Sequence, residues 1–497
     1  MSESADIQAR DGNTMDIPIS GDHRVREWLL GAATLALAWF AAAAVWAVPV
    51  LALLIWGTSW LPLGPLLFLV AVMARNTLTA HGPLPGRAVR PAAEPELAAL
   101  VQDVAERLGF HEPLLVRVVP EVQAALGRAR VSGVRSHVLV LGLPLLRTLT
   151  EAELASVIAH ELAHGLHTNS RRAQLLRYAR ARLADRLDGR IRPLAPLAGP
   201  LLRASQPVLW RAETAADADA ARIAGAGATA GALRRTELLH SVFAGLGEAW
   251  LSGLAEEEAY PEDFYDAVDA ALADPQVARR AARAAAEEEA LDPYATADHP
   301  PVAVRVAALP PHTGAQVYGD TPVRLRTAEP VERWCVLRLA LLDGEEEEDV
   351  HPVRLLDMVH SQLRTLGDDT GSTLLRQATG RDDPAAAVSA ALDSLADGTW
   401  QRLARRLEPG LRWAPAAIGG QLARTVFTAA VSRTLAEALL ASGWTPAGRW
   451  LITALTPPAA GDRVVDVHQL VGEAVDSGDP AAPRTLLVSA QAKENAV

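Results

Sequence analysis

The sequence predicts a mainly α-helical protein with one small β-sheet, an N-terminal two-span transmembrane hairpin and a helical C-terminal region. Three observations support this fold class. No charged residue occurs from Trp28 to Met73. Apolar residues recur at helical spacing through most of the later chain, and strand-like runs occur within residues 114–141.

The overall composition narrows the class of protein. Half of the 497 residues are hydrophobic and 21% are charged, which suits a globular protein with a small membrane portion. The net charge of −12 argues against a nucleic-acid partner, because binding phosphates requires a concentrated basic face. Cys335 is the only cysteine, so the chain forms no intramolecular disulfide, which fits a reducing compartment.

Residues 1–27 are polar and are predicted to be a disordered cytoplasmic tail. The uncharged run that follows is too long for one membrane span of ~20 residues and long enough for two, so the hairpin is predicted over residues 28–74. The run begins too late and is too long for a secretory signal. The alternative is a helical hairpin buried in a soluble core, although such helices normally carry polar positions.

The turn of the hairpin has two candidate places, Ala47–Pro49 and the glycine- and proline-rich residues 57–65. Arginines lie beyond both ends of the run, at positions 24, 26, 75, 87 and 90. For two spans, the positive-inside rule places both ends in the cytoplasm. We therefore expect a multi-pass protein of the inner or plasma membrane whose following domain is cytoplasmic.

Residues 75–94 are predicted to be a linker, and residues 94–108 a helix that Gly109 ends. Strand-like runs follow at Leu114–Val119 and Ser136–Leu141, with a middle strand expected at Val122–Leu126 and a turn near Ser132–Gly133. An exposed edge of this sheet would accept an extended peptide through backbone hydrogen bonds.

Residues 150–167 are predicted to form a helix that carries an H-E-x-x-H motif, with Thr150 and Glu153 as its capping box. Positions i and i+4 share a helix face, so His160 and His164 can reach one metal ion, with Glu161 beside it. A catalytic zinc site has three protein ligands and a water, and a nearby carboxylate takes a proton from that water. The motif also arises by chance on ordinary amphipathic helices, so a third ligand is needed. His167 is read as non-ligating.

A second helix is predicted at residues 210–227, after an arginine-rich helix at 171–190 and a proline-broken connection at 192–207. On it, Glu213 and Asp217 share one face, and two carboxylates without a nearby lysine repel each other. One explanation is that Glu213 faces a cation while Asp217 accepts a hydrogen bond from a ligand. The alternative is that both are solvated surface acids.

Further long helices are predicted over residues 229–290, and a short helix follows His299 and ends at Pro310–Pro311, where we place a domain boundary. Residues 312–497 are predicted to be helical and show no metal, phosphate or nucleophile constellation. Their isolated histidines (351, 360, 468) are read as structural, and their tryptophans (400, 413, 444, 450) as core residues.

Three separated motifs then agree with one family: HELAH at 160–164, ETAAD at 213–217 and HPPVAVR at 299–305. The chain resembles the membrane zinc metallopeptidases of the HtpX and CAAX prenyl protease type over roughly residues 95–310. The resemblance implies a zincin-like metallopeptidase domain, which we place at residues 95–311. One departure is that the Asn-Ala-Phe type segment of the substrate-binding edge strand is here Gln123–Ala125.

The resemblance also implies roles for seven residues. His160, His164 and Glu213 would be the zinc ligands, and Glu161 the general base. Asp217 would orient a ligand histidine, and His299 and Arg305 would lie near the cleft and bind or polarise the substrate carbonyl.

The predicted function is that of a membrane-anchored zinc endopeptidase acting on polypeptides, including membrane proteins, in quality control or processing. Its implied cofactor is Zn²⁺, and its partners are the polypeptide substrate and the lipid bilayer. Two alternatives are a membrane-anchored, non-catalytic interaction protein that keeps a structural zinc site, and a prenyl-protein processing enzyme. Glu161 argues against the first, and a two-span anchor argues against the second.

Overall fold

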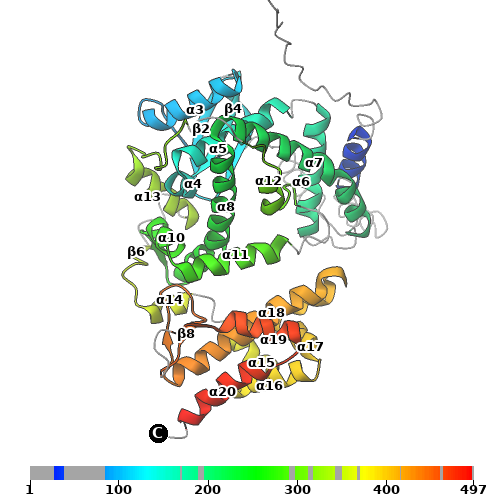
Figure 1. The fold of residues 1–497 in the computed structure, drawn as a ribbon, viewed down its shortest axis with the longest axis vertical. Helices are drawn as coiled ribbons and strands as arrows, with labels where there is room; N and C mark the ends of the chain where they lie inside the picture. Colours follow the sequence, from blue (N-terminus) through cyan, green and yellow to red (C-terminus); the bar gives the residue numbers. More distant parts are fainter. Residues whose placement is uncertain are drawn as a thin grey trace, which may run out of the picture. The chain divides into compact units, whose positions relative to one another are not determined.

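The computed structural model describes most of the chain after residue 83. The described residues are 27–38, 84–131, 133–167, 171–188, 195–289, 297–311, 317–341, 350–366, 370–414, 416–458 and 463–494. Contacts divide the chain into two compact units, one of Met1–Thr58 with Thr168–Leu209 and one of Ser59–His167 with Trp210–Val497. Helices dominate both units, as the sequence predicts (Figure 1).

The predicted transmembrane hairpin lies almost wholly outside the described residues. Of its span, residues 28–38 are described; they are helical, with Trp28 and Leu29 exposed and Ala38 buried. Within the described ranges, no helix is both long enough and apolar enough to cross a membrane.

The first unit also holds α6 (Arg171–Asp188) and the beginning of α7 (Ala195–Ala224). The predicted proline-broken connection at 192–207 is wrong over residues 195–207, because α7 continues through Pro200 and Pro207. A proline disturbs the hydrogen bonds of the preceding turn. Here the buried Arg180 side chain donates to the Leu202 carbonyl (2.6 Å) and to the Ser205 hydroxyl (2.7 Å), so side chains stabilise the turn before Pro207.

The main sheet precedes the motif helix, as predicted, and has the strand order β1-β2-β4-β3. Its strands are β1 (Arg87–Ala88), β2 (Leu114–Val119), β3 (Ala124–Val131) and β4 (Val134–Gly142). β2 and β4 are parallel, and β3 pairs antiparallel with β4 from Ala124 opposite Leu141 to Val131 opposite Val134. The middle strand therefore begins two residues later than expected and extends further. In this order β3 is an edge strand.

Two further small sheets differ from the single sheet that the sequence predicts. One joins β5 (Ala259–Pro261) to β6 (His351–Val353) in parallel, and the other has the order β7-β8-β9. Strands this short carry too few alternating residues to be recognised in a sequence. The strands of the third sheet are β7 (Thr445–Pro446), β8 (Ala454–Thr456) and β9 (Val465–Asp466).

In the second unit, up to residue 311, the motif helix α5 (Glu151–His167) lies among the other helices and contacts α3, α8 and β3 (Figure 1). The predicted helix at 94–108 is confirmed as α3 (Pro95–Leu108), and Gly109 ends it at a φ of 75°. The other helices here are α4 (Leu143–Thr148), α8 (Ala226–Val242), the π-helix Phe243–Gly247, α9 (Glu248–Glu256), α10 (Phe264–Leu272), α11 (Pro275–Glu289) and α12 (Val302–Ala307).

The chain beyond Pro310–Pro311 returns to the beginning of the motif helix. The Glu151 amide donates to the Thr321 carbonyl (2.9 Å), and the Ala152 amide donates to the Gly319 carbonyl (3.1 Å). These contacts satisfy two of the N–H groups that a helix N-terminus leaves without an internal partner. Residues 319–321 therefore hold the first turn of α5.

Residue Glu94 makes a second attachment of the same segment. Its buried carboxylate accepts hydrogen bonds from the backbone amides of Arg326 (2.6 Å) and Thr327 (2.8 Å). Apolar residues after Pro311, among them Tyr318 and Val336, belong to the same buried cluster as the core of α5. The buried core around α5 thus includes residues on both sides of the boundary predicted at 310–311.

The C-terminal part is helical, as predicted. Its helices are α13 (Ala328–Leu339), α14 (His360–Leu366), α15 (Thr370–Thr379), α16 (Pro384–Ala396), α17 (Trp400–Leu407), a 3-10 helix (Pro409–Trp413), α18 (Ala416–Ala441), α19 (Val467–Ser477) and α20 (Ala481–Glu494). From Leu375 onward, most of its buried apolar residues form a second cluster. Trp444 belongs to that cluster, whereas Trp450 joins the first one.

Candidate metal centre

Helix α5 presents the two motif histidines from a rigid position. The capping box is confirmed, because the Glu153 amide donates to the Thr150 hydroxyl (3.3 Å) and the Thr150 amide to the Glu153 carboxylate (3.0 Å). Leu154 and Ile158 are fully buried beneath the helix. Near its C-terminal end, Gly165 packs so closely against β3 that an added Cβ atom would lie 2.7 Å from Leu126. Both ends of α5 are therefore fixed.

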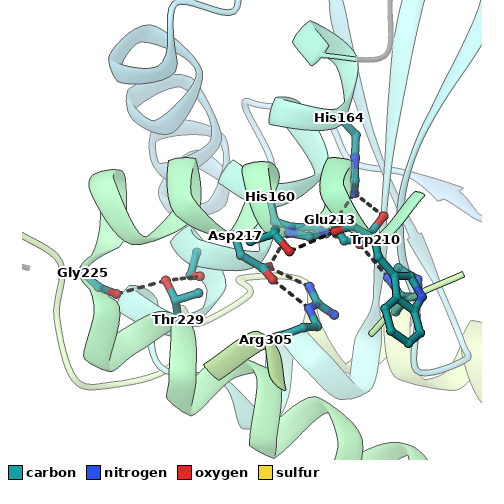
Figure 2. A network of polar contacts seen from close by, with 11 residues as sticks. His160, His164, Trp210, Glu213, Asp217, Gly225, Thr229 and Arg305 are labelled. Atoms are coloured by element: carbon teal, nitrogen blue, oxygen red, sulfur yellow. Dashed lines mark hydrogen bonds and ion pairs between the residues drawn. The ribbon is translucent and has the colours of Figure 1, made fainter. Parts of the chain in front are cut away.

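Helix α7 brings Glu213 to the two histidines, as Figure 2 shows. The Nε2 atom of His160 lies 3.3 Å from one carboxylate oxygen of Glu213, and the Nε2 atom of His164 lies 3.2 Å from the other. The two Nε2 atoms are 3.0 Å apart, with the imidazole rings nearly perpendicular at 89°. All three side chains are buried.

This group has the chemistry of a catalytic zinc site. Two imidazoles and one carboxylate are a ligand set that zinc takes in such sites. One ligand atom from each of His160, His164 and Glu213 lies within 4.8 Å of the others. The Nε2 atoms and the carboxylate face each other directly, so the donors that a zinc ion would use point to one place. The three residues fit a zinc ion.

Buried charges shape the protonation of the site. Burial lowers the pKa of His160, but the Asp217 and Glu213 carboxylates outweigh it and raise that pKa to about 9. Burial raises the pKa of Glu213, yet the neighbouring histidines hold it far below its usual range. Glu213 is therefore ionised, as a metal ligand must be.

Asp217 lies behind His160, one helical turn after Glu213 on α7 (Figure 2). One of its oxygens is 2.9 Å from Nδ1 of His160, although that nitrogen is not aligned for a hydrogen bond. The Arg305 guanidinium donates to both oxygens of Asp217, at 2.8 and 2.7 Å. Burial raises the pKa of Asp217, but the hydrogen bonds from Arg305 and the nearby charges of Arg305 and His160 outweigh it, so the net shift is downward.

Arg305 comes from the short helix α12, and its position differs in kind from that of His299 just before the helix. Arg305 is buried against Asp217, whereas the side chain of His299 is 59% exposed. The Nδ1 atom of His299 lies 2.6 Å from a carboxylate oxygen of Glu213. Residues 299–305 therefore supply His299, which contacts the candidate metal ligand Glu213, and Arg305, which binds Asp217.

Glu161 is half-buried on α5, next to the first motif histidine. Burial lowers the pKa of both His160 and Arg305, Asp217 raises it most, and the charge of Glu161 adds to the rise, which places Glu161 in the same electrostatic cluster. The structure thus brings together all seven residues that the sequence singles out. The side chain of His167 lies outside the described residues.

A hydrogen-bonded pair behind the site was not found from the sequence. The Ser156 hydroxyl donates to the Thr229 hydroxyl (2.9 Å), which donates to the Gly225 carbonyl (3.0 Å) at the junction of α7 and α8 (Figure 2). Ser156 lies four residues before His160, on the same face of α5. That spacing was the available signal, but a lone serine gives no indication of its partner.

Comparison with known proteins gives one match. The model of peptidase family M48 matches residues 91–311, which contain all seven residues of the site. No curated protein and no solved structure was matched. Members of this family are zinc metallopeptidases, and the His160–His164–Glu213 cluster fits their cofactor. Over residues 91–311 the chain therefore matches peptidase family M48, and the protein is a metallopeptidase.

Proposed function

We propose that the protein is a membrane-anchored zinc endopeptidase that cleaves polypeptides, including membrane proteins, in quality control or processing. The observation that carries the proposal is the buried cluster of His160, His164 and Glu213 with Glu161 beside it. A purely structural zinc site needs no base next to the metal, so Glu161 favours an enzyme over a non-catalytic zinc protein.

In this mechanism, His160, His164 and Glu213 hold the zinc ion. A zinc ion bound there would act as a Lewis acid toward the scissile carbonyl and would lower the pKa of a bound water. Glu161 takes the proton from the attacking water and later delivers it to the leaving amine, as a general base that becomes a general acid. In this proposal the carboxylate of Glu161 reaches the water from the substrate side of the cluster.

The remaining residues have positioning and substrate-binding roles. Arg305 fixes Asp217 through two hydrogen bonds, and Asp217 in turn fixes the ring of His160 by its charge. The exposed His299 side chain contacts Glu213 through Nδ1, so its other nitrogen is the group best placed to donate to the substrate carbonyl. We assign Arg305 to positioning rather than to substrate contact, because it is buried.

The substrate binds along β3 in this proposal. β3 lies at the edge of its sheet. Its Leu126 packs against Gly165 of α5, the residue that follows His164. An extended peptide that adds to this edge would run beside the metal cluster and present its backbone to it. Because Ala124 and Ala125 have small side chains, we expect weak selection for particular substrate side chains here.

Two experiments test the proposal separately. Glu161→Gln should retain zinc and lose nearly all cleavage of an unfolded protein such as casein, whereas the exposed Glu106→Gln should match the wild type. Near wild-type cleavage by zinc-loaded Glu161→Gln would refute the mechanism. For the anchor, reporter fusions after residue 20 and after residue 80 should both report the cytoplasm. Opposite sides would mean a single span and a different placement of the active site.

A further inference from the structure

A small pocket lies in the C-terminal part, outside the family match, and none of its lining residues belongs to the metal cluster. Its cavity of about 50 Å³ is lined by Arg364 of α14, three residues of α18 (Arg433, Glu437, Leu440) and Ile452, which precedes β8. All five are half-buried, so the pocket opens to solvent. α14 contributes to the first buried cluster and α18 to the second, so the pocket is built where the two clusters adjoin.

The acidic side chain of this pocket has a hydrogen-bond partner, whereas its two arginines have no carboxylate at ion-pair distance among the described residues. The Ser372 hydroxyl of α15 donates to the carboxylate of Glu437, which holds it in place. Within the residues that the structure describes, neither Arg364 nor Arg433 has a carboxylate at ion-pair distance. Two guanidinium groups and one carboxylate leave an excess of one positive charge, which one monoanion would neutralise.

Size and lining narrow the ligand further. A water-sized group needs ~10–15 Å³ of such a cavity, so the pocket takes about three to five heavy atoms. That is enough for a carboxylate and the first carbon atoms behind it. Leu440 and Ile452 offer aliphatic contact for those carbons, and Glu437 disfavours a dianion such as phosphate. Arginine also binds a carboxylate in a two-pronged geometry that suits its planar shape.

We propose that this pocket binds the carboxylate of a small aliphatic molecule, either a free acid or the C-terminal residue of a peptide. Arg364 and Arg433 bind the carboxylate, and Leu440 with Ile452 contacts the aliphatic body. This site goes beyond the proposed peptidase activity. Because its walls come from α14 and α18, an occupied pocket links the two helices and stabilises the region around them.

Calorimetric titration of the full-length, zinc-loaded protein tests the proposal. The probes are isovalerate as a free acid, N-acetyl-leucine as a mimic of a peptide C-terminus, N-acetyl-leucinamide, which lacks the carboxylate, and inorganic phosphate. We expect saturable binding of a carboxylate at millimolar concentration, and no binding of the amide. If isovalerate binds more tightly than N-acetyl-leucine, the natural ligand is a free acid; if N-acetyl-leucine binds more tightly, it is a peptide C-terminus.

Variants separate this pocket from the metal site, which can also bind carboxylates. Arg364→Gln and Arg433→Gln should each weaken binding about 10-fold or more, as expected for a charged hydrogen bond. The exposed Arg402→Gln on α17 is the matched control and should bind like the wild type. Unchanged melting temperatures without ligand would confirm that the variants fold.

Three results would overturn the proposal. They are no saturable carboxylate binding by the wild type, equal binding by the wild type and both glutamine variants, and binding of the amide or of inorganic phosphate as tight as that of the carboxylates.

Discussion

Replacing Asp217 with asparagine tests whether the group behind the metal cluster holds it in place. The substitution keeps the shape of the side chain and removes its charge. It removes the carboxylate that pairs directly with the buried guanidinium of Arg305, whose two hydrogen bonds both go to Asp217 oxygens. It also replaces one carboxylate oxygen, an acceptor, with an NH₂ group, a donor, and this donor then faces either Arg305 or His160.

The structure sets the size of the effect. Asp217 is 2% exposed and Arg305 is 9% exposed, so the pair is buried. Breaking a buried ion pair by removing one partner costs about 3–5 kcal/mol of unfolding free energy. Loss of the group that orients a metal-binding histidine costs about 10–100-fold in metal affinity. We therefore expect a less stable protein that binds zinc more weakly.

Two measurements check these expectations. Denaturant unfolding of the zinc-free protein gives the stability loss, and competition with a chromogenic chelator gives the zinc affinity. The double variant Asp217→Asn/Arg305→Gln removes the stranded charge, so it should recover part of the stability. It should not recover the zinc affinity, because His160 still lacks its carboxylate.

The matched control is Asp219→Asn on the same helix, whose half-buried carboxylate pairs with the exposed Arg222. A partly exposed pair of this kind contributes about 0–1 kcal/mol, so this variant should lose little stability. It should bind zinc normally, because Asp219 is not one of the residues of the metal cluster. If Asp217→Asn behaves like Asp219→Asn in both measurements, the positioning role of Asp217 is refuted.

Three further perturbations address other parts of the molecule. Gly165→Ala should cost about 1–3 kcal/mol, because its Cβ atom would lie 2.7 Å from Leu126. Burial lowers the pKa of His468 to about 4, below the ordinary value of 6.5, so the unfolded chain takes up a proton first as the pH falls. Stability should therefore fall between about pH 6.5 and 4, by up to about 3 kcal/mol, and His468→Gln should flatten that dependence. Glu94→Ala should cost about 1–3 kcal/mol, because it removes the buried carboxylate that accepts hydrogen bonds from the amides of Arg326 and Thr327.

Each of these variants has a control. Gly227→Ala places its Cβ atom in open space and should be neutral or slightly stabilising. His351→Gln, at an exposed histidine, should keep the wild-type pH dependence, and Glu96→Ala, at an exposed glutamate, should leave stability unchanged. Thermal unfolding across pH 4–8 measures all six variants. A control that loses as much stability as its partner would contradict the packing or charge argument for that pair.

The metal cluster was predictable because its residues sit at fixed helical spacings. His160 and His164 are one turn apart on α5, and Glu213 and Asp217 are one turn apart on α7. Spacing gives the face that two residues share, but it does not say which faces meet. That α5 and α7 meet came from the resemblance of three motifs, and the structure confirms the meeting by the distances at Glu213.

Other features depend on contacts that no local pattern carries. Helix α7 continues through Pro200 and Pro207, and the side chain that stabilises the disturbed turn, Arg180, comes from a different helix. The return of residues 319–321 to the first turn of α5 uses backbone groups, which every residue has. Sequence reasoning therefore found the residues of the site and missed part of the framework that supports it.

The order of the ligands along the chain gives the metal a mechanical role as well. His164 lies near the end of the segment Ser59–His167, and Glu213 lies near the beginning of the segment that starts at Trp210; both segments belong to the same compact unit. The excursion between them, Thr168–Leu209, belongs to the other unit. A metal ion held by both residues closes a loop of 49 residues (213 − 164). If the metal acts as a cross-link, closing a loop of this length lowers the entropy of the unfolded chain, which stabilises the folded state by on the order of 4 kcal/mol. Removing the metal would thus loosen the chain on both sides of the excursion at once, so metal-starved protein should be open to degradation as well as inactive.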